Sequence, residues 1–259
     1  MTSIVKTMII HHLPDSNDFT ALERWFWQHH CHEVLLQVPW TKRYVMYRAV
    51  FMPPPEVEAF GYFNYRVHEN WVGAEGRRGI NGTLSMTPQP GKMEVIIVSV
   101  PAEPTEDFMG AELMYGEKTI LRWLTVFRYP DGVSLEEGEQ WYLNVHVPEV
   151  MQQQGLIRFF SHKAISGSPL PGHSSKQKPF VTDCGPLLPL QWHRISEMWY
   201  ENHNGWVDSV VKSPPKYTKP SWARYDQFPF LQPRNEFIST FLLERPDQDM
   251  LRYYEPSYI

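Results

Sequence analysis

The sequence predicts an α+β fold made of two copies of one unit, and three observations carry this prediction. The chain has 259 residues, of which 42% are hydrophobic and 20% charged, so folding buries roughly 70% of the unfolded surface in a globular core. Residues 14–34 and 130–150 share seven identical residues at a constant separation of 116 positions. Each half also passes through apolar, helical and alternating segments in the same order.

The repeat extends over most of the chain, because residues 93–107 also match residues 235–249. We therefore expect a first unit over 1–110 and a second unit over 116–259, and the second carries an inserted loop at about 166–189, which is either a linker or a lid. The matched positions are Pro14/Pro130, Asp15/Asp131, Glu23/Glu139, Trp25/Trp141, His30/His146, Glu33/Glu149 and Val34/Val150, followed by Arg66/Arg194, Glu69/Glu197 and Trp71/Trp199.

Each unit begins with an apolar strand, which a Pro-Asp turn separates from a helical stretch. An alternating strand follows, then a polar passage, a second helical or irregular piece around Trp71 or Trp199, and a last strand. This order predicts two tandem ferredoxin-like repeats, whose bare sheet faces close against each other into an α+β barrel within one chain. The expected strands are 5–11, 43–50 and 93–100 in the first unit, and 120–127, 157–164 and 236–243 in the second.

Charge and cysteine content exclude several classes of protein. The formal net charge is −5, with 24 Lys and Arg against 29 Asp and Glu, and no run of like charge marks a binder of nucleic acid or anionic membranes. Two cysteines make no disulfide framework, and no apolar run is long enough for a signal peptide core or a membrane span. We expect a cytoplasmic protein, and exposed sheet edges favour a homodimer.

The first helix of each unit carries a polar pair on its apolar face. With 100° per residue, His30 and Glu33 fall within the apolar stripe, and His146 and Glu149 repeat the pattern. Either the pair is structural, bonded to itself, to a backbone carbonyl or to an arginine of the next strand, or a histidine acts as a general acid or base. We expect no metal, because His29 and His32 point to other sides of the helix than His30.

Two segments resemble a known family. WYLNVHVPEVMQQQGLIRFFSHKA and its weaker twin WFWQHHCHEVLLQVPWTKRYVMYRA resemble the EthD-like family of the dimeric α+β barrel superfamily, in which the helix ends in His-x-Pro and an aromatic pair begins the next strand. The matching residues are His146 with Pro148 and, in the first copy, His30, whereas His32 stands where the second copy has Pro148. The resemblance implies a pocket between helices and sheet, flat aromatic substrates, a His and a Tyr that move protons, and chemistry mostly without an organic cofactor.

The sequence thus predicts a cofactor-independent lyase, isomerase or cyclase that acts on a small aromatic or enolizable substrate, in aromatic catabolism or polyketide metabolism. A non-catalytic ligand-binding or stress-response protein, a cofactor-free monooxygenase and a haem protein are the alternatives. The glutamates would orient the helix histidines, and Arg66, Arg77 or Arg194 would hold an anionic group. The predicted catalytic residues are His30, His146, Glu33, Glu149, Tyr44, His68 and His193, and the predicted substrate-binding residues are Trp25, Arg66, Trp71, Trp141, Arg194, Trp199, Tyr200 and His203.

Two further interpretations stay open at the level of sequence. The pairs Arg66 with Glu69 and Arg194 with Glu197 are candidates for a structural ion pair in each copy. The Gly-rich stretch at 75–82 is either a solvated turn or a holder for a substrate carboxylate. No nucleophile elbow, phosphate loop, dinucleotide fingerprint or zinc protease motif occurs, which argues against serine hydrolases, kinases and dehydrogenases.

Overall fold

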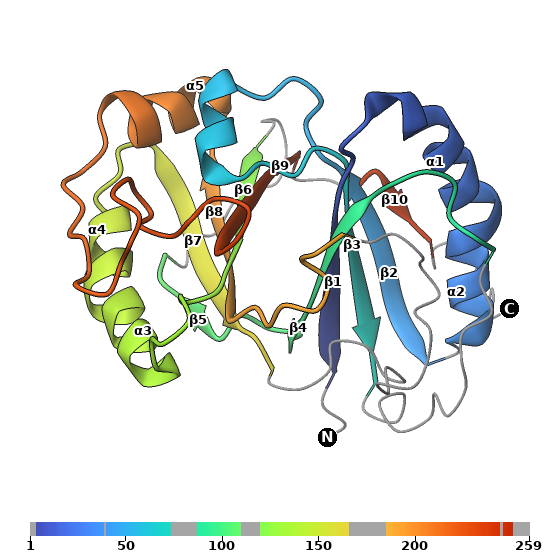
Figure 1. Ribbon diagram of the computed structural model, residues 1–259, viewed down its shortest axis with the longest axis horizontal. Coiled ribbons are helices and arrows are strands. Elements are labelled where there is room, and N and C mark those ends of the chain that lie inside the picture. Colours follow the sequence, from blue (N-terminus) through green and yellow to red (C-terminus); the bar gives the residue numbers. More distant parts are fainter. Residues whose placement is uncertain are drawn as a thin grey trace, which may run out of the picture.

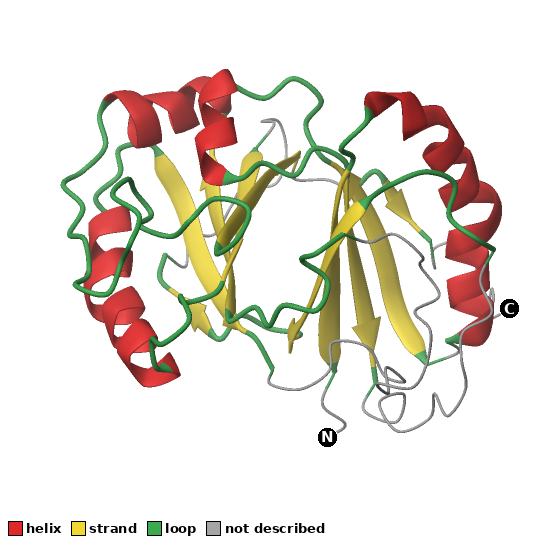
Figure 2. Cartoon of the chain, viewed as in Figure 1, coloured by secondary structure: helices red, strands yellow, loops and turns green. Residues whose placement is uncertain are grey.

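Two five-stranded antiparallel sheets face each other in the computed structural model, and helices lie on their outer sides (Figures 1 and 2). This architecture confirms the predicted fold class. The structure describes residues 4–38, 40–73, 87–109, 120–165, 185–243 and 246–250.

Both sheets have the ferredoxin-like strand order 2-3-1-4, and a short strand extends the edge of each. The first sheet contains β10 (Gln248–Asp249), β2 (Thr41–Arg48), β3 (Arg66–Val72), β1 (Val5–His12) and β4 (Glu94–Pro101), in that order. The second contains β5 (Glu106–Asp107), β7 (Leu156–Lys163), β8 (Arg194–Tyr200), β6 (Leu121–Phe127) and β9 (Phe237–Leu243).

The halves exchange their edge strands. β5 comes from the end of the first half and pairs with β7, and β10 comes from the end of the second half and pairs with β2. Backbone hydrogen bonds also join the sheets at both sides of the barrel. Phe63 N donates to Ser239 O at 2.7 Å, and Ile165 N donates to Ser99 O at 2.8 Å. The two sheets therefore form one continuous structure.

The segments around Trp71 and Trp199 are strands, β3 and β8, and not the helical or irregular pieces that we expected. Residues of β3 and β8 are almost all buried, on both faces of the sheet, and each face carries a charged residue: Arg66 and Arg194 on the helix side, Glu69 and Glu197 between the two sheets. Because both faces carry polar side chains, the sequence shows no alternation in hydrophobicity that would have revealed a strand.

A long helix packs on each sheet, and a π-helical turn interrupts both at the same place. In a π-helical turn the backbone hydrogen bonds span one residue more than in an α-helix; such turns are rare and are frequently found at functional sites. The first helix consists of α1 (Phe19–Trp25), η2 (Phe26–His30) and α2 (Cys31–Gln37). The second consists of α3 (Leu135–Trp141), η5 (Tyr142–His146) and α4 (Val147–Val150).

Shorter helices complete the layers. Ser134 caps α3 by accepting a hydrogen bond from Glu137 N at 3.1 Å, which satisfies a free amide of the first turn. Gly61 ends η3 with φ +60, and a Cβ there would lie 2.6 Å from Phe237 O, so only glycine fits. The remaining helices are η1 (Ser16–Asp18), η3 (Pro55–Phe60), α5 (His203–Trp206) and η6 (Val207–Lys212).

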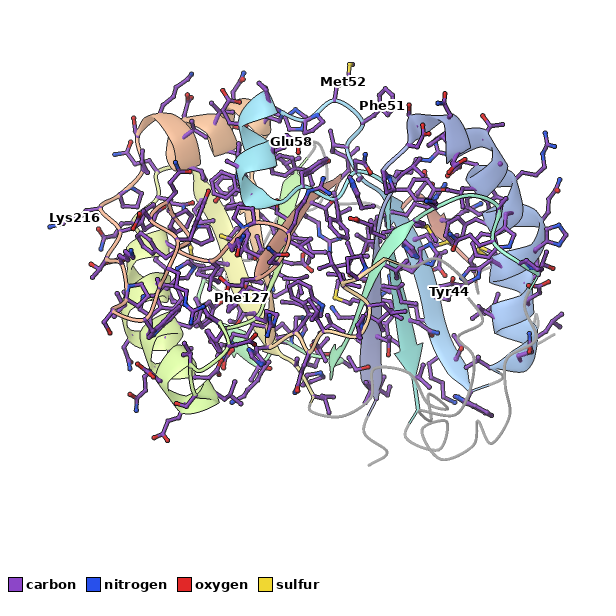
Figure 3. The ribbon with its side chains drawn as sticks, viewed as in Figure 1. Tyr44, Phe51, Met52, Glu58, Phe127 and Lys216 are labelled. Atoms are coloured by element: carbon purple, nitrogen blue, oxygen red, sulfur yellow. The ribbon has the colours of Figure 1, made fainter. Side chains whose placement is uncertain are left out.

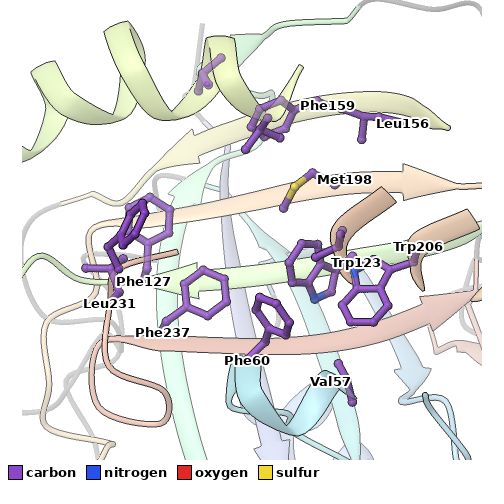
Figure 4. Packing of buried hydrophobic residues seen from close by; sticks show 14 of the residues in the cluster. Val57, Phe60, Trp123, Phe127, Leu156, Phe159, Met198, Trp206, Leu231 and Phe237 are labelled. Atoms are coloured by element: carbon purple, nitrogen blue, oxygen red, sulfur yellow. The ribbon is translucent and has the colours of Figure 1, made fainter. Parts of the chain in front are cut away.

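Three large apolar clusters fill the layers. One lies between the two sheets and takes residues from both, among them Ile10, Val67, Val126 and Ile238. One lies under the first helix, and the largest lies on the outer face of the second sheet, where Phe60 of η3 packs against Trp123 and Trp206 (Figure 4). In the described part of the chain, no helix is long and apolar enough to cross a membrane.

Candidate active site

The strand register defines which residues of the two halves are equivalent. His11 lies opposite Arg66 in the ladder of β1 and β3, and Phe127 lies opposite Arg194 in the ladder of β6 and β8. The space between helix and sheet in each half is called here the first or the second interior. Tyr44 belongs to the first interior and Phe127 to the second (Figure 3). Equivalent positions of the two interiors are His11 and Phe127, His30 and His146, Tyr44 and Phe159, Met46 and Ser161, and His68 and Ser196.

The first interior gathers three histidines and a tyrosine. The Tyr44 hydroxyl lies 3.1 Å from Nδ1 of His68. The His68 ring centre lies 4.7 Å from that of His11 and 6.1 Å from that of His30, and Phe26 packs edge-on between them. All four polar residues are buried. The structure thus brings together His30, Tyr44 and His68, which the sequence singled out, with His11, which it did not.

Burial keeps these imidazoles neutral. It lowers the pKa of His11 to about 3, with a further contribution from His30, and the pKa of His30 to about 4. Burial and the neighbouring His11 and His30 also place the pKa of His68 well below its usual value. Burial also raises the pKa of Tyr44 well above its ordinary value of 10. At neutral pH the cluster therefore carries no charge and offers both proton donors and acceptors.

Two ring nitrogens of this cluster have no hydrogen-bond partner, Nδ1 of His30 and Nε2 of His68. A buried polar atom without a partner costs about 1–3 kcal/mol. With the Tyr44 hydroxyl donating to His68 Nδ1, the proton of His68 sits on Nε2, which makes Nε2 an unused donor. His30 is the last residue of the π-helical turn, so this turn sets the direction of its ring.

The second interior keeps one histidine and replaces the others. His146 ends the second π-helical turn, and burial lowers its pKa to about 3. The Tyr142 hydroxyl and the Ser196 hydroxyl lie 2.8 Å apart. A small pocket remains, and the free space in it is about 10 Å³, room for one water molecule. Its lining is Trp123, Thr125, Phe127, Trp141, Tyr142, His146, Ser196, Met198, Phe228, Pro229, Leu231 and Phe237.

The glutamates do not orient the histidines, contrary to our expectation. Glu33 accepts hydrogen bonds from the backbone N and the hydroxyl of Thr87, and Glu149 accepts the same two from Thr218. The π-helical turn lies between the start of each helix and its glutamate. Because this turn rotates the residues after it, the 100° wheel places Glu33 and Glu149 too far inward. Both are half-buried at the helix edge.

Arg66 and Arg194 are not free to bind an anionic substrate. Arg66 donates to both oxygens of Glu23, at 2.7 and 2.8 Å, and Arg194 donates to both oxygens of Glu139 at 2.7 Å. The expected pairs with Glu69 and Glu197 do not form, because residues three apart in a strand point to opposite faces. Glu69 and Glu197 instead pair with Arg122 between the two sheets.

The remaining predicted residues divide between the interiors and other places. Trp25 lies at 4.6 Å from His30 and Trp141 at 4.9 Å from His146, measured between ring centres, so both tryptophans line their interior. Trp199 donates to Glu197 on the inner face of the barrel, and Trp71 packs there with Arg43. These two therefore lie outside both interiors.

Three further candidates also have structural partners. The Tyr200 hydroxyl donates to Gln153 at 2.5 Å. Nδ1 of His193 accepts from Tyr129 N at 2.9 Å. His203 packs on Phe241 at the start of α5. Arg77 with the stretch 75–82, and most of the expected lid, 166–184, lie outside the described residues.

No group of three or more His, Cys, Asp or Glu among the described residues has a geometry that holds a metal ion. Cys31 is buried next to Met46, and burial raises the pKa of its thiol to about 12, so it is not a nucleophile. His11, Ser196 and Phe228 are the residues that sequence reasoning missed. His11 had one signal, since its aligned partner Phe127 is apolar and a residue present in one copy only is a functional suspect.

Comparison with known proteins adds a partial family match. Residues 2–86 match the model of the chalcone isomerase N-terminal domain, which covers less than half of the chain. Among curated proteins, none matches the sequence. The EthD-like resemblance therefore stays a prediction. The matched range contains all four polar residues of the first interior, His11, His30, Tyr44 and His68.

Two solved structures are similar over nearly the whole chain. One is a candidate monooxygenase from Lactobacillus acidophilus NCFM, with 13% identity, a TM-score of 0.34 and coverage of 96% of each chain. The other is an anthrone oxidase-like protein, with 8% identity, a TM-score of 0.47 and coverage of 96% of this chain and 93% of that chain. Similarity at this level does not define a common activity.

Proposed function

We propose that the chain is an isomerase-type enzyme that moves a proton on a small aromatic ketone or enone, and that the first interior is its active site. One observation carries this proposal: two buried imidazoles, 6.1 Å apart, each have a ring nitrogen without a partner. Unpaired polar atoms in a buried site are expected where a substrate supplies the missing partner. The partial match to a chalcone isomerase domain supports the same class, since a chalcone is an aromatic enone.

The proposed reaction needs only groups of the chain. Nδ1 of His30 takes a proton from the carbon next to the substrate carbonyl, and the electrons of that bond move to the carbonyl oxygen. Nε2 of His68 donates a hydrogen bond to this oxygen and stabilises the enolate, while Tyr44 holds the His68 tautomer. His30 then returns the proton to another position of the enolate, which gives the isomer.

The neutral state of the histidines fits these roles. An imidazole with a pKa of about 4, as in His30, is fully unprotonated at pH 7 and so is ready to accept a proton. It is a weak base in isolation, but the enolate that forms beside it favours the protonated imidazole. The proton transfer therefore becomes easier as negative charge develops on the substrate oxygen.

Hydrogen exchange tests the proposal directly. The protein is incubated in D₂O with aryl ketones that carry a hydrogen on a saturated carbon next to the carbonyl, including a β,γ-unsaturated aryl ketone, and proton NMR follows both deuterium incorporation and the appearance of the conjugated isomer. We expect Tyr44→Phe and His30→Gln to slow exchange by about 100-fold. Tyr44→Phe removes a single oxygen, so it tests the chemistry even if His30→Gln were to fold poorly.

Two matched variants locate the reaction. His29 is exposed on the same helix, and His29→Gln is expected to leave the exchange rate unchanged. His146→Gln removes the equivalent histidine of the second interior, and we expect it to retain exchange as well. Exchange that depends on His146 and not on His30 would contradict the assignment to the first interior. Ligand binding without any exchange would support a binding protein instead of an enzyme.

A further inference from the structure

The pocket of the second interior is closed by a segment that the first repeat lacks. In the first repeat, residues 88–93 join Thr87 to β4, whereas in the second residues 219–236 join the equivalent Thr218 to β9. The longer segment carries Phe228, Pro229 and Leu231, which line the pocket. Most of the free space that a ligand would need is therefore occupied by a side chain of this insertion.

Phe228 lies as a planar ligand would lie. Its ring is nearly parallel to the ring of His146, at 5.5 Å between centres and 5° between planes. On another side it stacks on Tyr217, at 3.8 Å and 20°. Tyr217 is fixed, because its hydroxyl accepts a hydrogen bond from Gln153 at 2.7 Å. Trp141 adds a further aromatic wall next to His146, so the site is built to hold a flat ring.

The polar groups of the pocket indicate the chemistry of such a ring. The Tyr142 and Ser196 hydroxyls, 2.8 Å apart, and Thr125 provide hydrogen-bond donors and acceptors on the sheet side. No residue of the lining carries a carboxylate, an ammonium or a guanidinium group, and burial keeps His146 neutral. The hydroxyl or carbonyl group of an uncharged compound would form hydrogen bonds with these hydroxyls. A carboxylate would lose its hydration without gaining a counter-charge.

The insertion has a strained backbone next to Phe228. Phe230 is buried and has φ 66, a left-handed conformation that a bulky side chain rarely adopts. Strain of this kind lowers the energy difference between the closed arrangement and one in which the segment moves away. Displacement of Phe228 is therefore less costly than its burial alone would suggest.

We propose that the second interior is a binding site for a small, uncharged aromatic compound with a hydroxyl or carbonyl group, and that Phe228 occupies the place of the ligand ring until it is displaced. This site is separate from the first interior and does not depend on the proton transfer assigned there. In the wild-type chain the apparent association constant is the intrinsic one multiplied by the fraction of molecules in which Phe228 has moved out.

Calorimetric titration with 4-hydroxyacetophenone tests this proposal. Phe228→Ala removes the ring and leaves an apolar space of the kind that binds aromatic molecules, so we expect binding at least about tenfold tighter than in the wild type. The matched control is Phe51→Ala, because Phe51 is 86% exposed and points away from the molecule (Figure 3). Phe228→Leu is the second variant, and it is expected to bind with intermediate affinity.

The chemical class is tested with ligands and with Ser196→Ala. The anionic isostere 4-hydroxybenzoate is expected to bind Phe228→Ala at least about tenfold more weakly than 4-hydroxyacetophenone. Adding Ser196→Ala should weaken binding of 4-hydroxyacetophenone but not of toluene, and adding Tyr44→Phe should change neither. If neither Phe228 variant binds more tightly than Phe51→Ala, or if the gain disappears with Tyr44→Phe, the proposal is wrong.

Discussion

In the first repeat, the space between helix and sheet holds three histidines and a tyrosine, whereas the equivalent space of the second repeat holds one histidine among aromatic rings. Both have the same strand order and a helix with a π-helical turn that ends at His30 or His146. What differs are the strand positions that face the helix, where His11 and His68 become Phe127 and Ser196.

The comparison separates the contacts that both repeats share from the interior residues that differ between them. Both repeats keep an arginine of the third strand clamped by a helix glutamate, and both keep a glutamate that ties the helix to a threonine. These contacts lie at the rim of each interior and are the same in both repeats, although the residues inside differ. The shared contacts can therefore be tested through the free energy of unfolding, and the interior residues through proton uptake and ligand binding.

The largest expected effect is a loss of stability in mild acid. The folded-state pKa of His11 is about 3, that of His30 about 4 and that of His146 about 3, all below the ordinary 6.5, because burial disfavours the charged ring. The pKa of His68 is lowered in the same way. The unfolded chain thus takes up protons as the pH falls through 6.5, whereas the folded chain takes them up only near pH 4 and below.

The free energy of unfolding should therefore decrease as the pH falls from about 6.5 to about 4. A histidine that stays neutral in the folded state costs about 2 kcal/mol between pH 7 and pH 5. The three histidines of the first interior then cost about 6 kcal/mol, and His146 costs about 2 kcal/mol. Urea unfolding at pH 7, 6 and 5 measures this loss. His68→Gln and His146→Gln should each reduce the slope of the free energy of unfolding against pH by the contribution of about one proton. An unchanged profile in both variants would mean that these rings are already protonated in the fold.

The arginine clamps differ between the repeats in their second carboxylate. In the first repeat, Arg66 has Glu23 and a single contact with Asp247 at 3.2 Å. In the second, Arg194 has Glu139 and two contacts with Glu106, at 2.6 and 3.1 Å. Both guanidinium groups are almost completely buried. Loss of the helix glutamate consequently leaves Arg66 with fewer partners than Arg194.

Glu23→Gln is therefore expected to destabilise the chain more than Glu139→Gln. We expect a loss of about 3 kcal/mol for Glu23→Gln, because it leaves a buried charge poorly compensated, and about 1–2 kcal/mol for Glu139→Gln, where Glu106 remains. Chemical denaturation at pH 7 gives both values under identical conditions. Equal losses would show that Asp247, although a third of its side chain is exposed, compensates Arg66 as well as Glu106 compensates Arg194.

The internal repeat made the fold predictable, because identical residues such as Trp25 and Trp141 fixed the alignment of the halves before any strand was assigned. The alignment did not reveal β3 and β8, since strands that are buried on both faces and carry charges on both lack a period of two. The exchange of β5 and β10 between the halves could not be predicted from the sequence either. A two-residue edge strand forms because a neighbouring strand pairs with it, and its own sequence carries little preference for a strand.

The candidate site was predicted in part. His30, Tyr44 and His68 were candidates from their residue types and from the resemblance, and they lie in one cluster. The role of Glu33 was wrong because a π-helical turn has no sequence signature and changes the direction of the residues that follow it. The place of Phe228 depends on a contact with His146 over a long separation in sequence, and such contacts are specified only by the packed structure.

The smallest of the expected effects concerns a pair of core positions that hold two residues of equal size in the first repeat and a large and a small residue in the second. The first repeat has Leu13 and Leu22, both buried in one cluster. The second has Tyr129 and Gly138 at the equivalent places, and a Cβ at Gly138 would lie 2.5 Å from the Tyr129 ring. The ring has little freedom to move, because the Tyr129 hydroxyl donates to Glu139 at 2.7 Å.

Gly138→Ala is therefore expected to destabilise the chain by about 1–2 kcal/mol, since the steric cost of overpacking exceeds the gain of about 1 kcal/mol from better helix propensity. Thermal unfolding of the variant measures the loss. In the background of Tyr129→Leu, which recreates the leucine of the first repeat, the same substitution should become neutral or stabilising, because the ring that it meets is gone. If Gly138→Ala stabilised the chain with Tyr129 in place, the tyrosine ring would have room to move, and the pairing of Tyr129 with a glycine would not be a packing constraint.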